Sequence, residues 1–216
     1  MRTWANTLTG AGMRQNAVRA FLAGLLVVGL VWLLPVRRPG EDGGHHAGHE
    51  AAGPAPVADL FERAGVTELK EGQRGPAFRL ARWGGGEASL ETWQDRLVVL
   101  NFWATWCTPC TVEMPTLELL WREYGPRGLV VVGISVDRGA PAAVLEPYIR
   151  SLGITFPVLL DPDLRTAQAW RVTGLPATFL VRPGGEVAGM AFGAREWNSA
   201  EMKALLDTLL PAAHAH

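Results

Sequence analysis

A strand-like run that leads directly into a helix limits the fold of this chain more than any other feature. The run "LVVLNFW", Leu97–Trp103, is apolar except for Asn101, as is typical of a central strand buried on both faces. A second such run lies at Leu129–Val136. Between them, an apolar stripe at helical spacing is formed by Cys110, Met114, Leu117 and Trp121. Strand, helix and strand in this order predict a parallel pair joined by a right-handed crossover.

The segments around this unit also have the patterns of short strands and helices. The expected elements are an edge strand at Ala77–Leu80, a helix at Ala140–Gly153 interrupted near Pro147, a strand at Pro157–Leu160, a helix at Asp161–Val172 capped by Asp161, a hairpin of Ala177–Val181 and Glu186–Phe192, and a helix from Asn198. Together they predict a mixed central sheet flanked by helices on both faces, which is an α/β sandwich.

The N-terminal segments differ from this pattern. Residues 1–19 carry arginines but no acidic residue, and Ala20–Val36 is an uncharged apolar run near the short end of the about 17–25 residues that span a bilayer. No small-residue cleavage site follows closely, so we favour an uncleaved transmembrane anchor over a cleaved signal peptide. A buried core helix is a third interpretation, against which the flanking arginines argue. The positive-inside rule, by a narrow margin, places residues 1–19 in the cytoplasm and the rest outside.

A Gly-, His- and Pro-rich stretch at 37–68 predicts a flexible linker. The folded domain is then expected at 69–211, with a short tail at 212–216. Three linker side chains are of the type that binds transition metals: His45, His46 and His49. A His-rich tether that binds no metal is the simpler interpretation. The net charge of −1 does not indicate a nucleic-acid partner.

The chain has only two cysteines, Cys107 and Cys110, where the first strand passes into the helix. Unpaired N–H groups at a helix start carry partial positive charge, which lowers the pKa of a thiol there. Cys107 is therefore expected to be the nucleophile, and Cys110, one turn later, the thiol that resolves a mixed disulfide. Zinc requires four ligands, and a structural disulfide closing so short a loop stabilises little. A redox pair is favoured over these and over two unconnected core thiols.

The motifs "VVLNFWATWCTPC" and "GLPATFLV" resemble the thioredoxin superfamily, and specifically its TlpA/ResA-like branch of membrane-anchored extracytoplasmic thiol–disulfide oxidoreductases. The resemblance covers 69–211. It implies a thioredoxin fold with an insert after the strand that ends near Val136, and electron transfer through the two cysteines without a bound cofactor or metal. It also implies a protein disulfide substrate, apocytochrome c in several members, and a membrane electron donor of the thiol-reductase type.

Two adjacent positions, Leu175 and Pro176, gain a role from this resemblance. Pro176 matches the superfamily's cis-proline, which faces the cysteine pair and leaves the backbone of Leu175 free to pair with an extended substrate. Trp106 is expected to contact substrate, and together with Trp103 it flanks the site. Core packing alone would also explain both tryptophans.

Glu113 matches a carboxylate that lies three residues after the second cysteine in cytochrome-maturation members of the branch. One turn beyond Cys110, a buried carboxyl group with a raised pKa would carry protons for the thiols. The alternative is a solvated glutamate on the helix surface. Asn101 stands where cytosolic thioredoxins have a buried aspartate. Because asparagine cannot titrate, Glu113 becomes the expected proton carrier.

Two other function classes remain as alternatives. A peroxide-reducing peroxiredoxin would need a Pro-x-x-x-Thr-x-x-Cys pattern, which does not occur. A copper-delivery protein of the Sco type would need three residues between the cysteines and a histidine within the fold, and this sequence has neither. The apolar run at Ala20–Val36 and the resemblance together imply a single-pass enzyme of the cell membrane whose catalytic domain lies on the periplasm-like side.

Overall fold

Two adjacent parallel strands form the centre of the fold. In the computed structural model, which describes residues 57–139 and 141–210, strand β4 (Leu97–Trp103) pairs in parallel with β5 (Leu129–Ser135). Helix α3 (Thr108–Tyr124) connects them. Every residue of both strands is buried, because both faces of the sheet are covered. The prediction of a strand–helix–strand unit is confirmed.

One mixed sheet extends outward from this pair. Its strands lie in the order β1 (Thr67–Glu68), β8 (Val187–Phe192), β7 (Ala177–Val181), β4, β5, β6 (Val158–Leu160), β2 (Arg79–Arg82) and β3 (Glu87–Ser89). The hairpin of β7 and β8 is antiparallel, as predicted. The strand predicted at Ala77–Leu80 forms two residues later and is not at the edge, because β3 pairs outside it. The turn that allows this pairing holds three glycines at positive φ, Gly84, Gly85 and Gly86.

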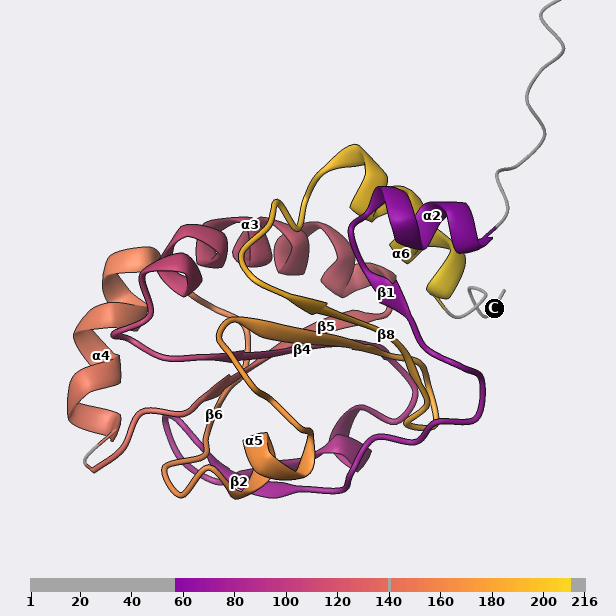
Figure 1. The fold of residues 1–216 in the computed structure, drawn as a ribbon. Coiled ribbons are helices and arrows are strands. Elements are labelled where there is room, and N and C mark those ends of the chain that lie inside the picture. Colours follow the sequence, from indigo (N-terminus) through magenta and orange to yellow (C-terminus); the bar gives the residue numbers. More distant parts are fainter. Residues whose placement is uncertain (1–56, 140, 211–216) are drawn as a thin grey trace, which may run out of the picture. The chain divides into compact units, whose positions relative to one another are not determined.

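Helices cover both faces of the sheet (Figure 1). The remaining described helices are α2 (Val57–Arg63), α4 (Pro141–Leu152), α5 (Arg165–Ala169) and α6 (Ala200–Leu209). Figure 1 shows α2, α3 and α6 on one face and α5 on the other, with α4 beside α3. The arrangement is the thioredoxin-like α/β fold, and α4 with β6 forms the insert expected after β5.

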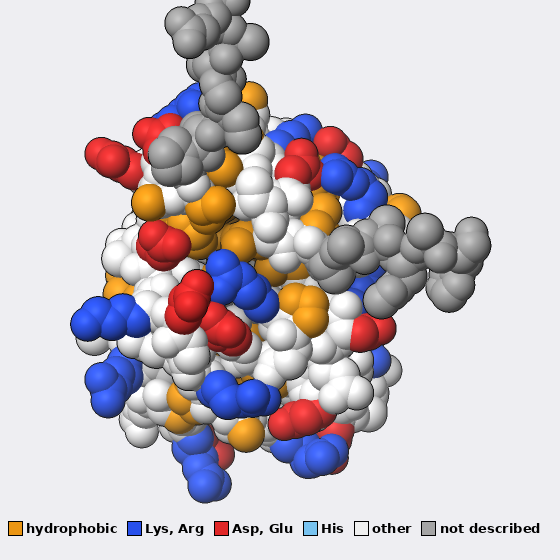
Figure 2. Space-filling view, turned by 90° about the vertical axis from the view of Figure 1, so that its right-hand side faces the viewer, with side chains coloured by type: hydrophobic (Ala, Val, Ile, Leu, Met, Phe, Trp, Pro, Cys, Tyr) orange, Lys and Arg blue, Asp and Glu red, His pale blue; other side chains and the backbone are white. Residues whose placement is uncertain are grey.

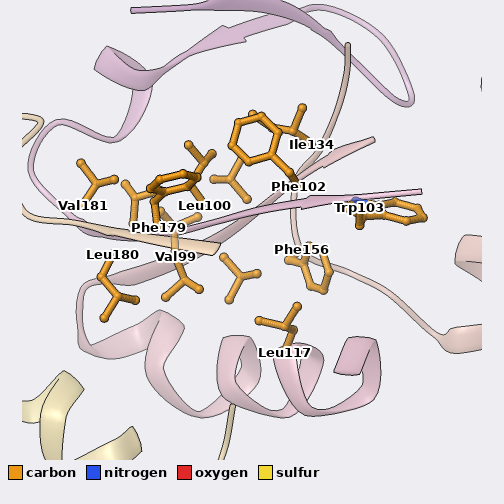
Figure 3. Packing of buried hydrophobic residues seen from close by; sticks show 14 of the residues in the cluster. Val99, Leu100, Phe102, Trp103, Leu117, Ile134, Phe156, Phe179, Leu180 and Val181 are labelled. Carbon is orange, nitrogen blue, oxygen red and sulfur yellow. The ribbon is translucent and has the colours of Figure 1, made fainter. Parts of the chain in front are cut away.

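The core side chains alternate between the two faces along β4 (Figure 3). Val99 points toward α3 and Leu117, whereas Leu100 and Phe102 point to the opposite face. On that face the ring of Phe179 lies 5.9 Å from the ring of Phe102 and 4.9 Å from that of Trp170. Complete burial of such side chains contributes about 1.5–3 kcal/mol each. This packing fixes the strand from which the cysteine loop continues.

The prediction of a flexible linker over 37–68 is wrong for residues 57–68, which form α2 and β1. Phe61 and Val66 are buried, and Thr67 pairs with Met190 of β8. Gly189 makes this approach possible, since a Cβ there would lie 2.8 Å from Phe61. Leu60 and Ala64 also pack against the core, so this segment is held by apolar contacts as well as by strand pairing.

Two helices begin later than predicted. Helix α5 begins at Arg165 rather than Asp161. The Asp161 carboxylate still caps it from a preceding turn, because it accepts the backbone N–H groups of Thr166 and Ala167 at 3.2 and 2.8 Å. Helix α6 begins after Ser199, whose hydroxyl oxygen accepts the N–H of Met202 at 3.2 Å. In both cases a side-chain acceptor sets the start of the helix.

Within residues 57–139 and 141–210, no helix is both long and apolar enough to cross a bilayer. The predicted span at Ala20–Val36, the histidines of the linker and the tail at 212–216 lie outside these residues. On the face drawn in Figure 2, basic and acidic side chains are interspersed over the described surface. That face therefore offers no broad basic area of the kind that binds polyanions.

Candidate redox site

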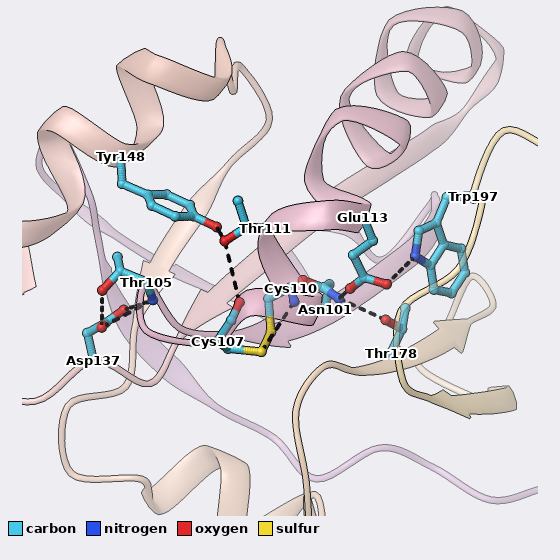
Figure 4. The surroundings of a disulfide bond; sticks show 10 residues. All are labelled: Asn101, Thr105, Cys107, Cys110, Thr111, Glu113, Asp137, Tyr148, Thr178 and Trp197. Atoms are coloured by element: carbon cyan, nitrogen blue, oxygen red, sulfur yellow. Dashed lines mark hydrogen bonds between the residues drawn. A yellow bond between two sulfur atoms is a disulfide. The ribbon is translucent and has the colours of Figure 1, made fainter.

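The two cysteines form a disulfide at the start of α3 (Figure 4). The Cys107 and Cys110 sulfurs are 2.10 Å apart. Cys107 is the N-cap residue of the helix, and its Sγ accepts the backbone N–H of Cys110 at 3.3 Å. Cys110 is fully buried, whereas Cys107 keeps an exposed fraction of 6% and lines a surface groove. Of the two sulfurs, Cys107 is the one that a partner molecule reaches first.

A buried carboxylate on the neighbouring strand end holds the loop that leads to Cys107. Asp137, which follows β5, accepts the backbone N–H of Thr105 at 3.0 Å and the Thr105 hydroxyl at 2.7 Å. The Ser135 hydroxyl donates to the same carboxylate at 2.8 Å. Asp137 was not predicted from the sequence. Asp137 directly follows a buried strand that is parallel to β4. Because parallel strands end at the same edge of the sheet, this position could have predicted that Asp137 lies near the cysteine loop.

Glu113 is buried within the fold, with an exposed fraction of 1%. Its Oε1 accepts the side-chain N–H of Asn101 at 2.8 Å, and its Oε2 accepts the indole N–H of Trp197 at 2.9 Å. Burial raises the pKa of this carboxyl group, and the bonds from Trp197 and Asn101 partly oppose that rise. The alternative of a solvated surface glutamate is therefore wrong.

Asn101 connects Glu113 to the strand that follows the proline. Its side-chain N–H also donates to the Thr178 hydroxyl on β7 at 2.9 Å. Trp197 completes the surroundings of the carboxyl group and was not found from the sequence. It lies in the segment between β8 and α6, 84 residues from Glu113 along the chain, so no local pattern links the two.

A groove of about 1130 Å³ opens beside Cys107. Trp106 and Leu175, both predicted to contact substrate, lie in its wall, and the bond between Leu175 and Pro176 is cis, as predicted. Trp106 is 70% exposed. Trp103 is instead fully buried and stacks on Tyr148 of α4, with ring centroids 5.1 Å apart. Of the two tryptophans, only Trp106 faces the groove.

The described residues contain no cluster of three or more histidine, cysteine or acidic side chains that could hold a metal ion.

A mixed sheet with a Cys-x-x-Cys disulfide at a helix start and a cis-proline beside it defines a thioredoxin-like thiol–disulfide oxidoreductase. The chain belongs to the AhpC/TSA family, whose model matches residues 72–190. It is similar to the thiol–disulfide oxidoreductase ResA of Bacillus subtilis, with 34% identity over 130 residues, 60% of this chain and 72% of the relative. ResA of Geobacillus thermodenitrificans is 32% identical over 145 residues, 67% of this chain and 81% of the relative.

Solved structures agree with this assignment. A thiol:disulfide interchange protein of the thioredoxin family from Chlorobium tepidum matches with a TM-score of 0.56 and 26% identity, over 65% of this chain and 98% of that one. A DsbF homologue from Corynebacterium diphtheriae shares the fold with a TM-score of 0.57 and 24% identity, over 79% of this chain and 100% of that one. Fold, disulfide and relatives thus point to the same class of enzyme.

Proposed function

We propose that this enzyme reduces disulfides in extracytoplasmic proteins through the Cys107/Cys110 dithiol, and that apocytochrome c is among its substrates. The observation that carries the proposal is the disulfide at the start of α3 with a buried carboxyl group behind it. Relatives named thiol–disulfide oxidoreductase ResA support the reaction class. The identity of the substrate protein rests on the resemblance to cytochrome-maturation members alone.

The first step uses the sulfur that lines the groove. In the reduced enzyme, the Cys107 thiolate attacks one sulfur of the substrate disulfide, and the substrate S–S bond breaks as a mixed disulfide forms. The other substrate sulfur leaves as a thiolate and takes up a proton. The backbone N–H of Cys110, which points at Cys107 Sγ in the disulfide, supports the thiolate at the helix start.

The second step releases the substrate. Cys110, one turn along α3, loses its proton to the carboxylate of Glu113 and attacks Cys107 Sγ. The mixed disulfide breaks, the substrate leaves as a dithiol, and the Cys107–Cys110 disulfide of the structure results. The substrate gains two electrons and the enzyme loses two. A thiol reductase in the membrane then restores the dithiol by the same exchange in reverse order, and no bound cofactor or metal takes part.

The groove provides a place for an extended substrate segment. Leu175 lies just before β7, whose ladder begins at Ala177, so its backbone is available to a peptide laid along the groove. Trp106 offers an exposed aromatic surface on the same wall as Cys107. The residues at Ala20–Val36 would anchor the enzyme in the cell membrane as a single span, with the catalytic domain on the periplasm-like side.

We expect the enzyme to act as a reductant. The midpoint potential of its disulfide should be close to the roughly −270 mV of thioredoxin and far from the about −120 mV of a strong oxidase. Equilibration of the full-length chain against glutathione buffers measures this value. A potential at the oxidase end would reverse the assigned direction of electron flow.

A trapping experiment tests the function itself. In Cys110→Ser the first step proceeds but the second cannot, so mixed disulfides between Cys107 and the substrate should accumulate in the native membrane. Cys107→Ser is the matched control and should trap nothing. If both variants give the same adducts, the proposed reaction is wrong. If the captured protein is not a cytochrome, the reaction stands and apocytochrome c is wrong as the substrate.

A further inference from the structure

The surroundings of Glu113 include a side chain that neither the reaction nor the comparisons assign. We propose that Trp197 is a positioning residue: its indole N–H holds the Glu113 carboxyl group in place for proton exchange with Cys110, and Arg195 anchors this indole to the segment that joins α2 and β1. The inference rests on the proposed proton-carrying role of Glu113 and deepens it.

Trp197 is fixed to α3 at two points one helical turn apart. Its indole N–H donates to Glu113 Oε2 at 2.9 Å. Its backbone N–H donates to the Thr116 hydroxyl oxygen at 3.1 Å, and that hydroxyl donates to the backbone carbonyl of Glu113 at 2.8 Å. The side chain of Trp197 is fully buried. Figure 4 shows the indole on the far side of the carboxyl group from Asn101.

The two donors on Glu113 have complementary effects on its geometry. Asn101 binds Oε1 from β4 and Trp197 binds Oε2 from the β8–α6 segment, so each oxygen has one neutral N–H donor. Burial disfavours the charged carboxylate, whereas each N–H bond favours it. Without the indole, the carboxyl group would lose one fixed partner and would hold its proton more tightly.

Arg195 ties this indole to the N-terminal part of the fold. Its guanidinium lies over the Trp197 ring, 5.6 Å from the ring centroid. The same guanidinium donates to the carbonyl oxygens of Phe192 at 2.9 Å and of Gly65, between α2 and β1. The turn between α2 and β1 is thus connected to Glu113 through the side chains of Arg195 and Trp197.

The groups that set the charge environment of Glu113 come from each element packed around it. Arg195 of the β8–α6 segment attracts its negative charge, and Tyr148 of α4 responds to that charge. Cys107 caps α3 and Cys110 lies in its first turn. Strands β4 and β7 contribute the neutral partners Asn101 and Thr178.

The test uses Trp197→Phe in the full-length chain, which removes the indole N–H and keeps an aromatic ring. We expect the pKa of Glu113 to rise, the acidic limb of the pH–rate profile to move to higher pH, and the second step near neutral pH to slow by about tenfold. Carboxyl ¹³C NMR of glutamate-labelled protein follows the titration directly, with Glu113→Gln assigning the signal. Arg195→Lys should shift the pKa in the same direction by less.

Trp170→Phe is the matched control. Trp170 is also buried, and its indole N–H donates to the carbonyl oxygen of Pro76 at 3.0 Å, away from Glu113. An unchanged Glu113 titration in Trp197→Phe, or an equal shift in Trp170→Phe, would overturn the inference. If Trp197→Phe does not fold, the titration in Arg195→Lys decides, because lysine keeps the positive charge near Glu113 and loses the guanidinium contacts to the indole and to Gly65; no shift there overturns the inference.

Two measurements separate this inference from the proposed function. In a Glu113→Gln background, Trp197→Phe should leave the pH profile unchanged, because the group it positions is gone. A further shift in that background contradicts the inference. If the wild-type chain reduces no disulfide, the proposed function fails, yet the NMR titration still reports whether Trp197 holds Glu113.

Discussion

Two buried carboxyl groups lie on either side of the disulfide, and they are bound in different ways. Glu113 of α3 accepts one N–H on each oxygen, from the side chains of Asn101 and Trp197. Asp137, after β5, accepts the backbone N–H and hydroxyl of Thr105 and the hydroxyl of Ser135. Asp137 lies at the wall of the open groove, whereas Glu113 does not line it.

The difference shows how the same functional group performs two tasks. The bonds of Asp137 fix the backbone of the loop that carries Cys107, so its role is to hold geometry. In the proposed mechanism Glu113 exchanges a proton, and burial raises its pKa despite the bonds it accepts from the side chains of Trp197 and Asn101 and from the backbone of Arg195. The elements that supply the donors distinguish the two carboxyl groups: Asp137 is bound by the loop that leads to Cys107, whereas Glu113 is bound from β4 and from the β8–α6 segment.

Among the variants considered, Glu113→Gln is expected to have the largest effect on the reaction rate. It keeps a planar side chain of similar size but removes the titrating group, so the release step near neutral pH should slow by about 10²-fold. Single-turnover kinetics with a disulfide substrate measure this step. Glu118→Gln is the matched control on α3: Glu118 is also buried but bonds to Arg122 and Thr155. Equal rates for the two variants would remove the contrast between a catalytic and a structural acid.

Asp137→Ala should act on stability first. It leaves the backbone N–H of Thr105 and the hydroxyls of Thr105 and Ser135 without their acceptor, and one buried unsatisfied donor costs about 1–3 kcal/mol. Chemical denaturation should therefore show a fall of at least that size in the free energy of unfolding. The pH–rate profile should keep its shape, in contrast to that of Glu113→Gln. A shifted profile with unchanged stability would exchange the two roles.

The parts of this site that the sequence predicted are those encoded by neighbouring residues. The run at Leu97–Trp103 and the two cysteines lie in short motifs whose local pattern is sufficient, whereas the cis bond before Pro176 was predicted from the resemblance to the family. For Glu113 the sequence left a buried and a solvated side chain open, and its burial is shown by the structure.

The parts that were missed depend on contacts between distant segments. Trp197 reaches Glu113 across 84 residues, and a tryptophan before a helix has no local feature that marks it as a hydrogen-bond donor to an active site. Residues 57–68 resemble a linker by composition, and only the sheet edge provided by β8 makes them fold. Asp161 was correctly predicted as a cap, but the extra turn before Arg165 was not visible in the pattern.

The pH dependence of stability sharpens the comparison further. The pKa of Glu113 is raised in the folded state above its usual value of 4.5, so the folded chain binds this proton more tightly than the unfolded one. The resulting stability is fully present below pH 4.5 and is lost as the pH rises through the folded-state pKa. The free energy of unfolding, measured by chemical denaturation at a series of pH values, should therefore fall in that window by at most about 1.4 kcal/mol per pH unit. Glu113→Gln should remove this slope, and a slope that persists would assign it to another group.

The smallest effect on the reduction rate is expected from Tyr148→Phe. This variant tests whether α4 supports the site through the ring stack of Tyr148 or through its hydroxyl. The Tyr148 hydroxyl bonds to the Thr111 hydroxyl at 2.9 Å in the first turns of α3, while the Tyr148 ring stacks on Trp103. Phenylalanine keeps the stack and loses the bond, which should cost about 0.5–1.5 kcal/mol of unfolding free energy. The reduction rate and its pH profile should stay close to wild type, because the bond contacts neither sulfur nor carboxyl group. A large fall in rate would instead make α4 a third support of the redox site, alongside Asp137 and Trp197.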